Sequence, residues 1–78
     1  MYIKADIMIG TNESLSYVVD TVTEIVQYYN GIPEDILSVS EATGGVRFVI
    51  EFGSGVDYDN VIDELSLEFG GEVSTFML

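Results

Sequence analysis

The sequence predicts an α+β domain with a four-stranded antiparallel sheet and two helices on one face, the ferredoxin-like arrangement. Three observations lead to this class. Apolar residues alternate in several short stretches, they recur at helical spacing in two longer stretches, and the elements follow in the order β-α-β-β-α-β with short connections. No repeat or linker interrupts the order, so we expect residues 1–78 to form a single ferredoxin-like domain.

The first strand and the first helix are predicted by two different periods. Residues 2–9 alternate between apolar and other positions, so one face of this strand is expected in the core. Residues 13–29 carry apolar side chains at i, i+3, i+4 and i+7, the spacing of an amphipathic helix. The residues expected to bound these elements are Gly10 at the strand end, Thr11 or Asn12 as the helix cap, and Asn30-Gly31 at the helix end.

The second half of the chain predicts a hairpin, a helix and a closing strand. The expected strands are residues 36–42, 46–52 and 73–78, and the expected helix is residues 57–69. Glycine pairs supply the breaks, at Gly44-Gly45 in the hairpin and Gly70-Gly71 after the helix. The sequence leaves open which side of the last strand faces the helices. The two alternatives are Val73, Thr75 and Met77, or Ser74, Phe76 and Leu78.

The composition is strongly acidic. The chain has 14 Asp and Glu against one Lys and one Arg, and a net charge of −12. This charge argues against binding to DNA, RNA or an anionic membrane, because those ligands need Lys and Arg to neutralise phosphate. RNA-recognition modules share the element order, but the charge and the inward-facing Phe48 and Phe52 disfavour that reading. The many Ile, Val, Phe and Tyr residues indicate a folded chain rather than a disordered one.

No motif for catalysis or metal binding is present. The chain has no His and no Cys, the residues that most often serve as bases and nucleophiles. The acidic run that begins at Asp57 suggests a calcium loop, but Ile62 stands at the sixth position, where the EF-hand requires Gly. We therefore expect no enzyme activity, no cofactor and no metal site.

The apolar content predicts a homodimer. In 78 residues, 47% are hydrophobic, more than one small core under two helices is expected to hide. The face of the sheet turned away from the helices is the expected interface, with Lys4 and Arg47 forming cross-strand ion pairs with Asp6 and Glu51. The candidate interface residues are Met8, Val49, and Phe76 or Met77, according to which side of the last strand faces the core. Without Cys or a membrane-spanning stretch, the protein is expected in the cytoplasm, that of the host cell if it is viral.

Most carboxylates fall on the expected outer surface of the two helices and just beside them. No cation stands four residues away from any acidic position of the first helix, so no intrahelical pair relieves the charge there. We expect this surface to bind a basic partner. The candidate partner-binding residues are Glu13, Asp20, Glu24, Glu34, Asp35, Asp57, Asp59, Asp63, Glu64 and Glu68.

In size, charge and freestanding architecture the chain resembles the small acidic proteins, many from bacteriophages, that imitate DNA. The resemblance implies a non-enzymatic inhibitor that occupies the DNA-binding site of a basic host protein, such as an HU-type nucleoid protein or a restriction or CRISPR component. Gly10 and Asn30-Gly31-Ile32 also loosely resemble the pattern of ACT-type modules, so the alternative is a small-molecule-binding or assembly module acting as a sheet-mediated dimer. Adaptation to high salt is disfavoured by two Ala against eight Ile.

Overall fold

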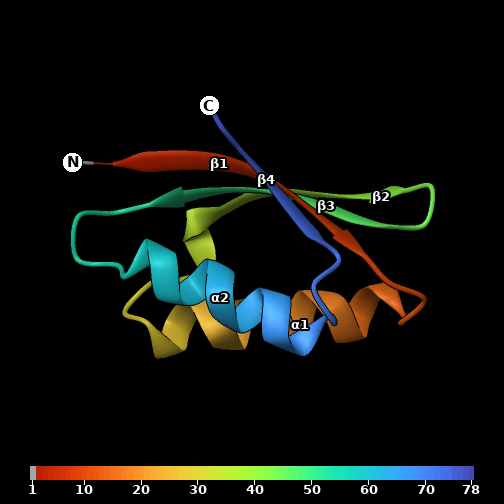
Figure 1. Cartoon of the computed structure of the whole chain (residues 1–78). Helices are drawn as coiled ribbons and strands as arrows, with labels where there is room; N and C mark the ends of the chain where they lie inside the picture. Colours follow the sequence, from red (N-terminus) through yellow and green to blue (C-terminus); the bar gives the residue numbers. More distant parts are fainter. Residues whose placement is uncertain (1) are drawn as a thin grey trace.

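The computed structural model describes residues 2–78 and has the predicted fold (Figure 1). The four strands form one antiparallel sheet in the order β2-β3-β1-β4, and both helices cover the same face. Neither helix is long and apolar enough to cross a membrane. The elements are β1 (Ile3–Gly10), α1 (Leu15–Tyr28), the short 3-10 helix η1 (Pro33–Asp35), β2 (Ile36–Ala42), β3 (Gly45–Phe52), α2 (Tyr58–Glu68) and β4 (Val73–Met77).

The core lies between the sheet and the two helices. β1 and β3 are the central strands, and their register places Ile7 opposite Phe48, so the alternating residues of both strands point to the same side. Helix α1 contributes a line of valines four residues apart, and α2 contributes Val61 and Leu65. The buried core residues are Ala5, Ile7, Ile9, Val18, Val22, Val26, Val46, Phe48, Ile50, Phe52, Val61, Leu65 and Phe69. Leu15, the first residue of α1, is exposed although it continues the apolar spacing of the helix.

Helix α1 begins two residues later than predicted because a different residue caps it. The Oγ of Ser14 accepts a hydrogen bond from the backbone N–H of Tyr17 at 3.3 Å, which satisfies one free donor of the first turn. Thr11 instead accepts from the N–H of Glu13 at 3.1 Å and so closes the loop that precedes the helix. Glu13 therefore lies outside α1.

The hairpin also differs from the prediction, whereas β1 ends at Gly10 as expected. Gly10 is the last residue of the β1 ladder and lies opposite Gly45. A Cβ on Gly45 would lie 2.0 Å from the carbonyl oxygen of Ile9, so the two strands approach closely enough there to require glycine. The hairpin turn is Thr43-Gly44, in which Gly44 has a φ of 79°. The second glycine thus serves strand pairing rather than the turn.

The pairing of β4 with β1 decides which side of β4 faces the helices. Val73 and Thr75 lie opposite the core residues Ile9 and Ile7, so the odd-numbered residues of β4 point toward the helices. Met77 shares that side, since its sulfur accepts a hydrogen bond from the Tyr58 hydroxyl of α2 at 3.3 Å. Ser74 and Phe76 therefore lie on the side of the sheet without helices, here called the open face.

One ion pair spans the centre of the open face. The Arg47 Nε lies 2.8 and 3.0 Å from the two carboxylate oxygens of Asp6, and a second guanidinium nitrogen also bonds Asp6. The hydrogen bonds from Arg47 hold the pKa of Asp6 below its ordinary value, and Asp6 raises the pKa of Arg47. Lys4 lies opposite Glu51, but within residues 2–78 only Arg47 and Asp6 are close enough to form an ion pair.

Replacing Arg47 tests what this ion pair contributes. Arg47→Gln should lower the melting temperature at pH 7 more than Lys4→Gln, although both variants remove one positive charge. Because the folded pKa of Asp6 is lowered, its stabilisation is fully present above the ordinary value of 3.8 and is lost as the pH falls through the folded pKa. The excess effect of Arg47→Gln should therefore shrink as the pH is lowered below 3.8, in thermal melts followed by circular dichroism. Equal effects of both substitutions at pH 7 would show that the pair contributes nothing.

Candidate functional site

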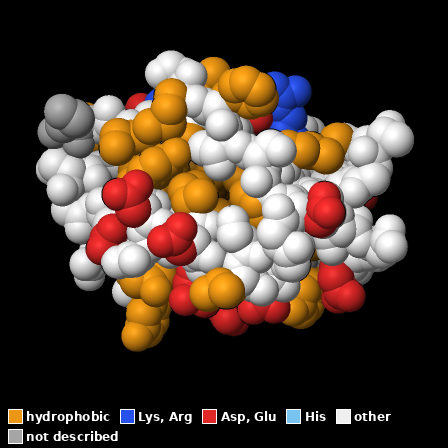
Figure 2. Space-filling view, viewed as in Figure 1, with side chains coloured by type: hydrophobic (Ala, Val, Ile, Leu, Met, Phe, Trp, Pro, Cys, Tyr) orange, Lys and Arg blue, Asp and Glu red, His pale blue; other side chains and the backbone are white. Residues whose placement is uncertain are grey.

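The two faces of the molecule differ sharply in charge. Residues 13–35 and 57–68, which hold α1, η1 and α2 and are here called the helical layer, contain ten carboxylates and no Lys or Arg. Lys4 and Arg47, the two cations of the chain, both project from the open face. Figure 2 shows carboxylates over the helices and blue cationic atoms at the side of the sheet. The helical layer is therefore a negative surface without internal neutralisation.

On α1 the acidic positions are free of local structural roles. Asp20 and Glu24 are exposed and lie one helical turn apart, about 6 Å along the axis from the 1.5 Å rise per residue. The Glu13 side chain is also exposed, in the loop before the helix. These positions match the sequence prediction, except that Glu13 is held by the loop rather than by α1.

Two of the predicted residues also cap local structure. Asp57 is the N-cap of α2, and its Oδ1 accepts a hydrogen bond from the backbone N–H of Asn60 at 3.3 Å. Asp35 is half-buried, and its Oδ2 accepts from the N–H of Ile32 at 3.0 Å. Each carboxylate satisfies a backbone donor that would otherwise lack a partner. Substitution of either residue would therefore disturb folding as well as charge.

Tyrosines join the carboxylates of α2 to the other helix. The Tyr17 hydroxyl donates to Glu68 at 3.2 Å, and the Tyr29 hydroxyl donates to Glu64 at 3.4 Å. These bonds fix Glu64 and Glu68 at the junction of α1 and α2. Burial raises the pKa of Tyr29, and the negative charge of Glu64 raises it further. No pattern in the sequence predicts these contacts, because residues far apart in the chain form them.

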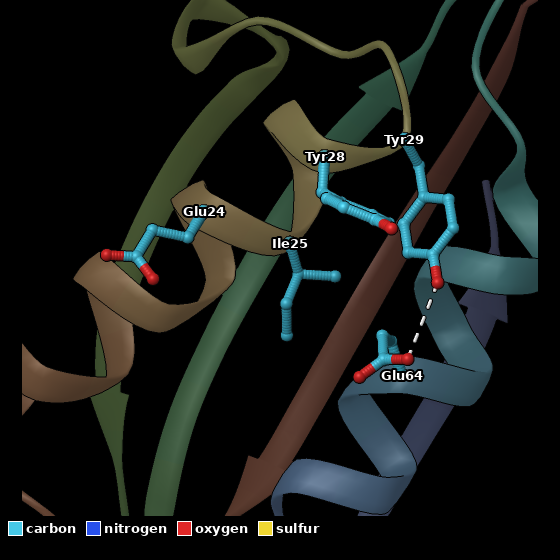
Figure 3. A pocket seen from close by; sticks show the side chains of 5 residues that line it. All are labelled: Glu24, Ile25, Tyr28, Tyr29 and Glu64. Atoms are coloured by element: carbon cyan, nitrogen blue, oxygen red, sulfur yellow. Dashed lines mark hydrogen bonds between the residues drawn. The ribbon is translucent and has the colours of Figure 1, made fainter.

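A hollow with two tyrosines in its lining lies near the C-terminal end of α1. It has a volume of about 340 Å³ and is lined by Glu24, Ile25, Tyr28, Tyr29 and Glu64. The tyrosine rings are 4.9 Å apart at an angle of 84°. Figure 3 shows Tyr29 reaching toward Glu64, whereas the carboxylate of Glu24 points away from the rings. Tyr28 is 79% exposed, and no pattern in the sequence predicts that its ring belongs to a site.

The remaining predicted residues, Glu34, Asp59 and Asp63, are exposed on the same layer. Within residues 2–78 no three carboxylates converge closely enough to hold a metal ion. The negative groups are therefore spread over the surface rather than gathered at a point.

The chain matches no protein-family model and no curated protein sequence.

Salt should stabilise this protein. The carboxylates of the helical layer repel one another, and the Debye length of about 10 Å at 0.1 M salt means that added salt screens much of that repulsion. We expect the melting temperature to rise between low salt and about 0.5 M NaCl. The double variant Asp20→Lys/Glu24→Lys should show a smaller rise. An unchanged melting temperature in the parent chain would show that its charges are already compensated.

Proposed function

We propose that this protein is a non-enzymatic DNA mimic whose helical layer occupies the DNA-binding site of a basic protein and inhibits it. The observation that carries the proposal is the segregation of charge, with ten carboxylates and no cation on the helical layer. The partner class is a basic DNA-binding protein of the cytoplasm, for example an HU-type nucleoid protein or a restriction or CRISPR component. If the chain is viral, this cytoplasm is that of the host cell.

The physical argument rests on preorganised charge. DNA presents its phosphates on a stiff scaffold, and here α1 and α2 hold carboxylates on a packed core, so little conformational entropy is lost on binding. The complementary fields of an acidic layer and a basic site also accelerate association. A single exposed ion pair contributes only about 0.2–1 kcal/mol, so affinity has to come from many pairs acting together. The ten carboxylates of the helical layer supply that number.

The hollow beside Tyr28 supplies a contact of a different kind. An arginine guanidinium is attracted to the face of an aromatic ring and to a carboxylate at the same time. Tyr28 and Glu64 line one hollow and offer both groups, and neither cation of this chain lies on the helical layer to fill it. We assign the hollow as the binding site, here called the arginine seat, of one arginine side chain from the partner. Its contact with the ring and the carboxylate is more specific than attraction between surface charges.

Charge reversal on α1 tests the main proposal. The double variant Asp20→Lys/Glu24→Lys changes the local charge by four units and should weaken binding to the basic partner at least tenfold, about 1.4 kcal/mol. The measurement is competition with fluorescent DNA, starting with an HU-type protein and then with any basic protein captured from bacterial lysate at low salt. The fold should persist because both side chains are exposed.

The matched control reverses two carboxylates outside the helical layer. Glu51→Lys/Glu72→Lys makes the same change in net charge on the side of the sheet without helices, since Glu51 lies opposite Lys4 and the Glu72 side chain lies beside Gly10. It should weaken binding much less, because these residues would not face the partner. Equal losses for both double variants would mean that only net charge matters, and a loss confined to the sheet variant would overturn the proposal.

A single substitution tests the arginine seat. Tyr28→Ala should weaken partner binding roughly two- to fivefold, from the 0.5–1 kcal/mol typical of an exposed cation–π contact. Tyr2→Ala is the control, since Tyr2 is similarly exposed but lies just before β1, outside the helical layer. Neither change should alter the melting temperature by more than a few degrees. Equal binding by the Tyr28 variant and the parent chain would remove the hollow from the interface.

One observation favours a second candidate, an assembly or ligand-binding module that works through the sheet. Apolar side chains are exposed around β4 and the open face, including Phe76 at 72% and Leu78 at 67%. Such a module would gain thermal stability when a small molecule binds to it. Altering its sheet would not improve its binding to a basic protein. A DNA mimic would instead show steep weakening of partner binding with salt.

A further inference from the structure

The edge formed by β4 is unprotected. β4 pairs with β1 alone, so its outer edge is free, and residues 73–78 contain no charged side chain and no proline. The opposite edge, β2, is interrupted by a bulge between Ile36 and Ser38 and carries Glu41, two features that discourage further pairing. Figure 2 shows hydrophobic side chains gathered on the side of the molecule where β4 lies in Figure 1. The β4 edge is therefore a template for another strand.

The hydrogen bonds to β1 show which backbone groups are free. The N–H of Leu78 donates to the carbonyl of Lys4 at 2.8 Å, and the carbonyl of Glu72 accepts from the N–H of Gly10 at 2.7 Å. In an antiparallel ladder the backbone groups of alternate residues point to opposite edges. The even-numbered residues of this segment therefore bond β1. The N–H and carbonyl groups directed to the free edge are those of Val73, Thr75 and Met77.

We propose that this edge binds the β4 edge of a second copy, in an antiparallel pair with Thr75 at a two-fold axis. The charge of the chain favours a second copy at this place. Each copy has a net charge of −12, and β4 is the strand without a carboxylate, so two copies repel each other least when they meet there.

The strand is also self-complementary in this register. Thr75 faces Thr75 of the second copy, Val73 faces Met77, and Ser74 faces Phe76, so every free N–H and carbonyl of β4 gains a partner. The pairing would cover Met77, 58% exposed on the helix side, together with Phe76 on the open face. A dimer packed through the open face would leave Met77 exposed.

This pairing extends the proposed function, and the role given to the dimer rests on the proposal that the protein imitates DNA. A two-fold axis perpendicular to the sheet keeps the helices of both copies on the same side. The eight strands would span about 34 Å at a spacing of about 4.8 Å, close to the length of one turn of B-DNA. The dimer would therefore present two helical layers side by side, and its acidic surface would be as long as a DNA-binding site.

Substitutions at Thr75 test the pairing in the full chain. Thr75→Pro removes the N–H that points to the free edge and costs the β1 ladder no hydrogen bond, so the variant should fold as a monomer. Thr75→Val keeps the N–H and should remain dimeric, and Val49→Lys on the open face should also remain dimeric. The measurement is sedimentation at tens of micromolar, with circular dichroism to confirm folding. A Thr75→Pro variant that stays dimeric, or a Val49→Lys variant that becomes monomeric, would overturn the proposal.

Amide hydrogen exchange of the parent chain decides the matter even if Thr75→Pro does not fold. The amides of Val73, Thr75 and Met77 should be protected at high protein concentration and exchange quickly on dilution. A parent chain that is monomeric at tens of micromolar, or a dimer in which these amides exchange freely, contradicts the pairing. Added salt should strengthen the dimer by screening repulsion, whereas it should weaken binding to a basic protein. Failure of the dimer and failure of the DNA mimicry are thus separate results.

Discussion

Repulsion among carboxylates is the constraint on which the rest of this structure depends. A net charge of −12 on 78 residues opposes compaction, and the single ion pair within residues 2–78, Arg47 to Asp6, relieves little of it. The chain folds because its apolar residues form one continuous core between sheet and helices, without a buried polar side chain among the described residues. The charge is then carried outward on α1, η1 and α2. Burial of the core thus offsets the repulsion among the carboxylates of the helical layer.

That surface and the sheet are proposed to have separate roles. The helical layer has carboxylates but no cation, and its tyrosines tie α1 to α2 so that Glu64 and Glu68 are held in place. The sheet has both cations, exposed apolar residues and a free edge. Recognition of a basic partner is proposed for the first surface and self-association for the second. Under these two proposals, a strongly acidic chain would dimerise without covering the carboxylates that are proposed to imitate phosphate.

The sequence predicts helices and strands from the short periods of their apolar residues. It does not predict contacts between residues that are far apart in the chain. Alternation in residues 46–52 and the valine spacing of α1 predicted the elements, the fold class and most of the core. The cap of α1 was misplaced because Thr11, Asn12 and Ser14 all have suitable side chains, and only the loop geometry selects Ser14. The same limit explains why the acidic positions of the helical layer were identified, but the hollow at Tyr28 and the bond between Tyr17 and Glu68 were not.

The central claim is that this protein and DNA compete for the same site on a basic protein. The most direct measurement follows labelled DNA bound to that protein by analytical ultracentrifugation while this chain is added at several salt concentrations. The account predicts that the chain releases the DNA, that no complex holds both, and that the apparent affinity of the chain falls steeply with salt, as that of DNA does. A stable complex containing the basic protein, DNA and this chain together would contradict it.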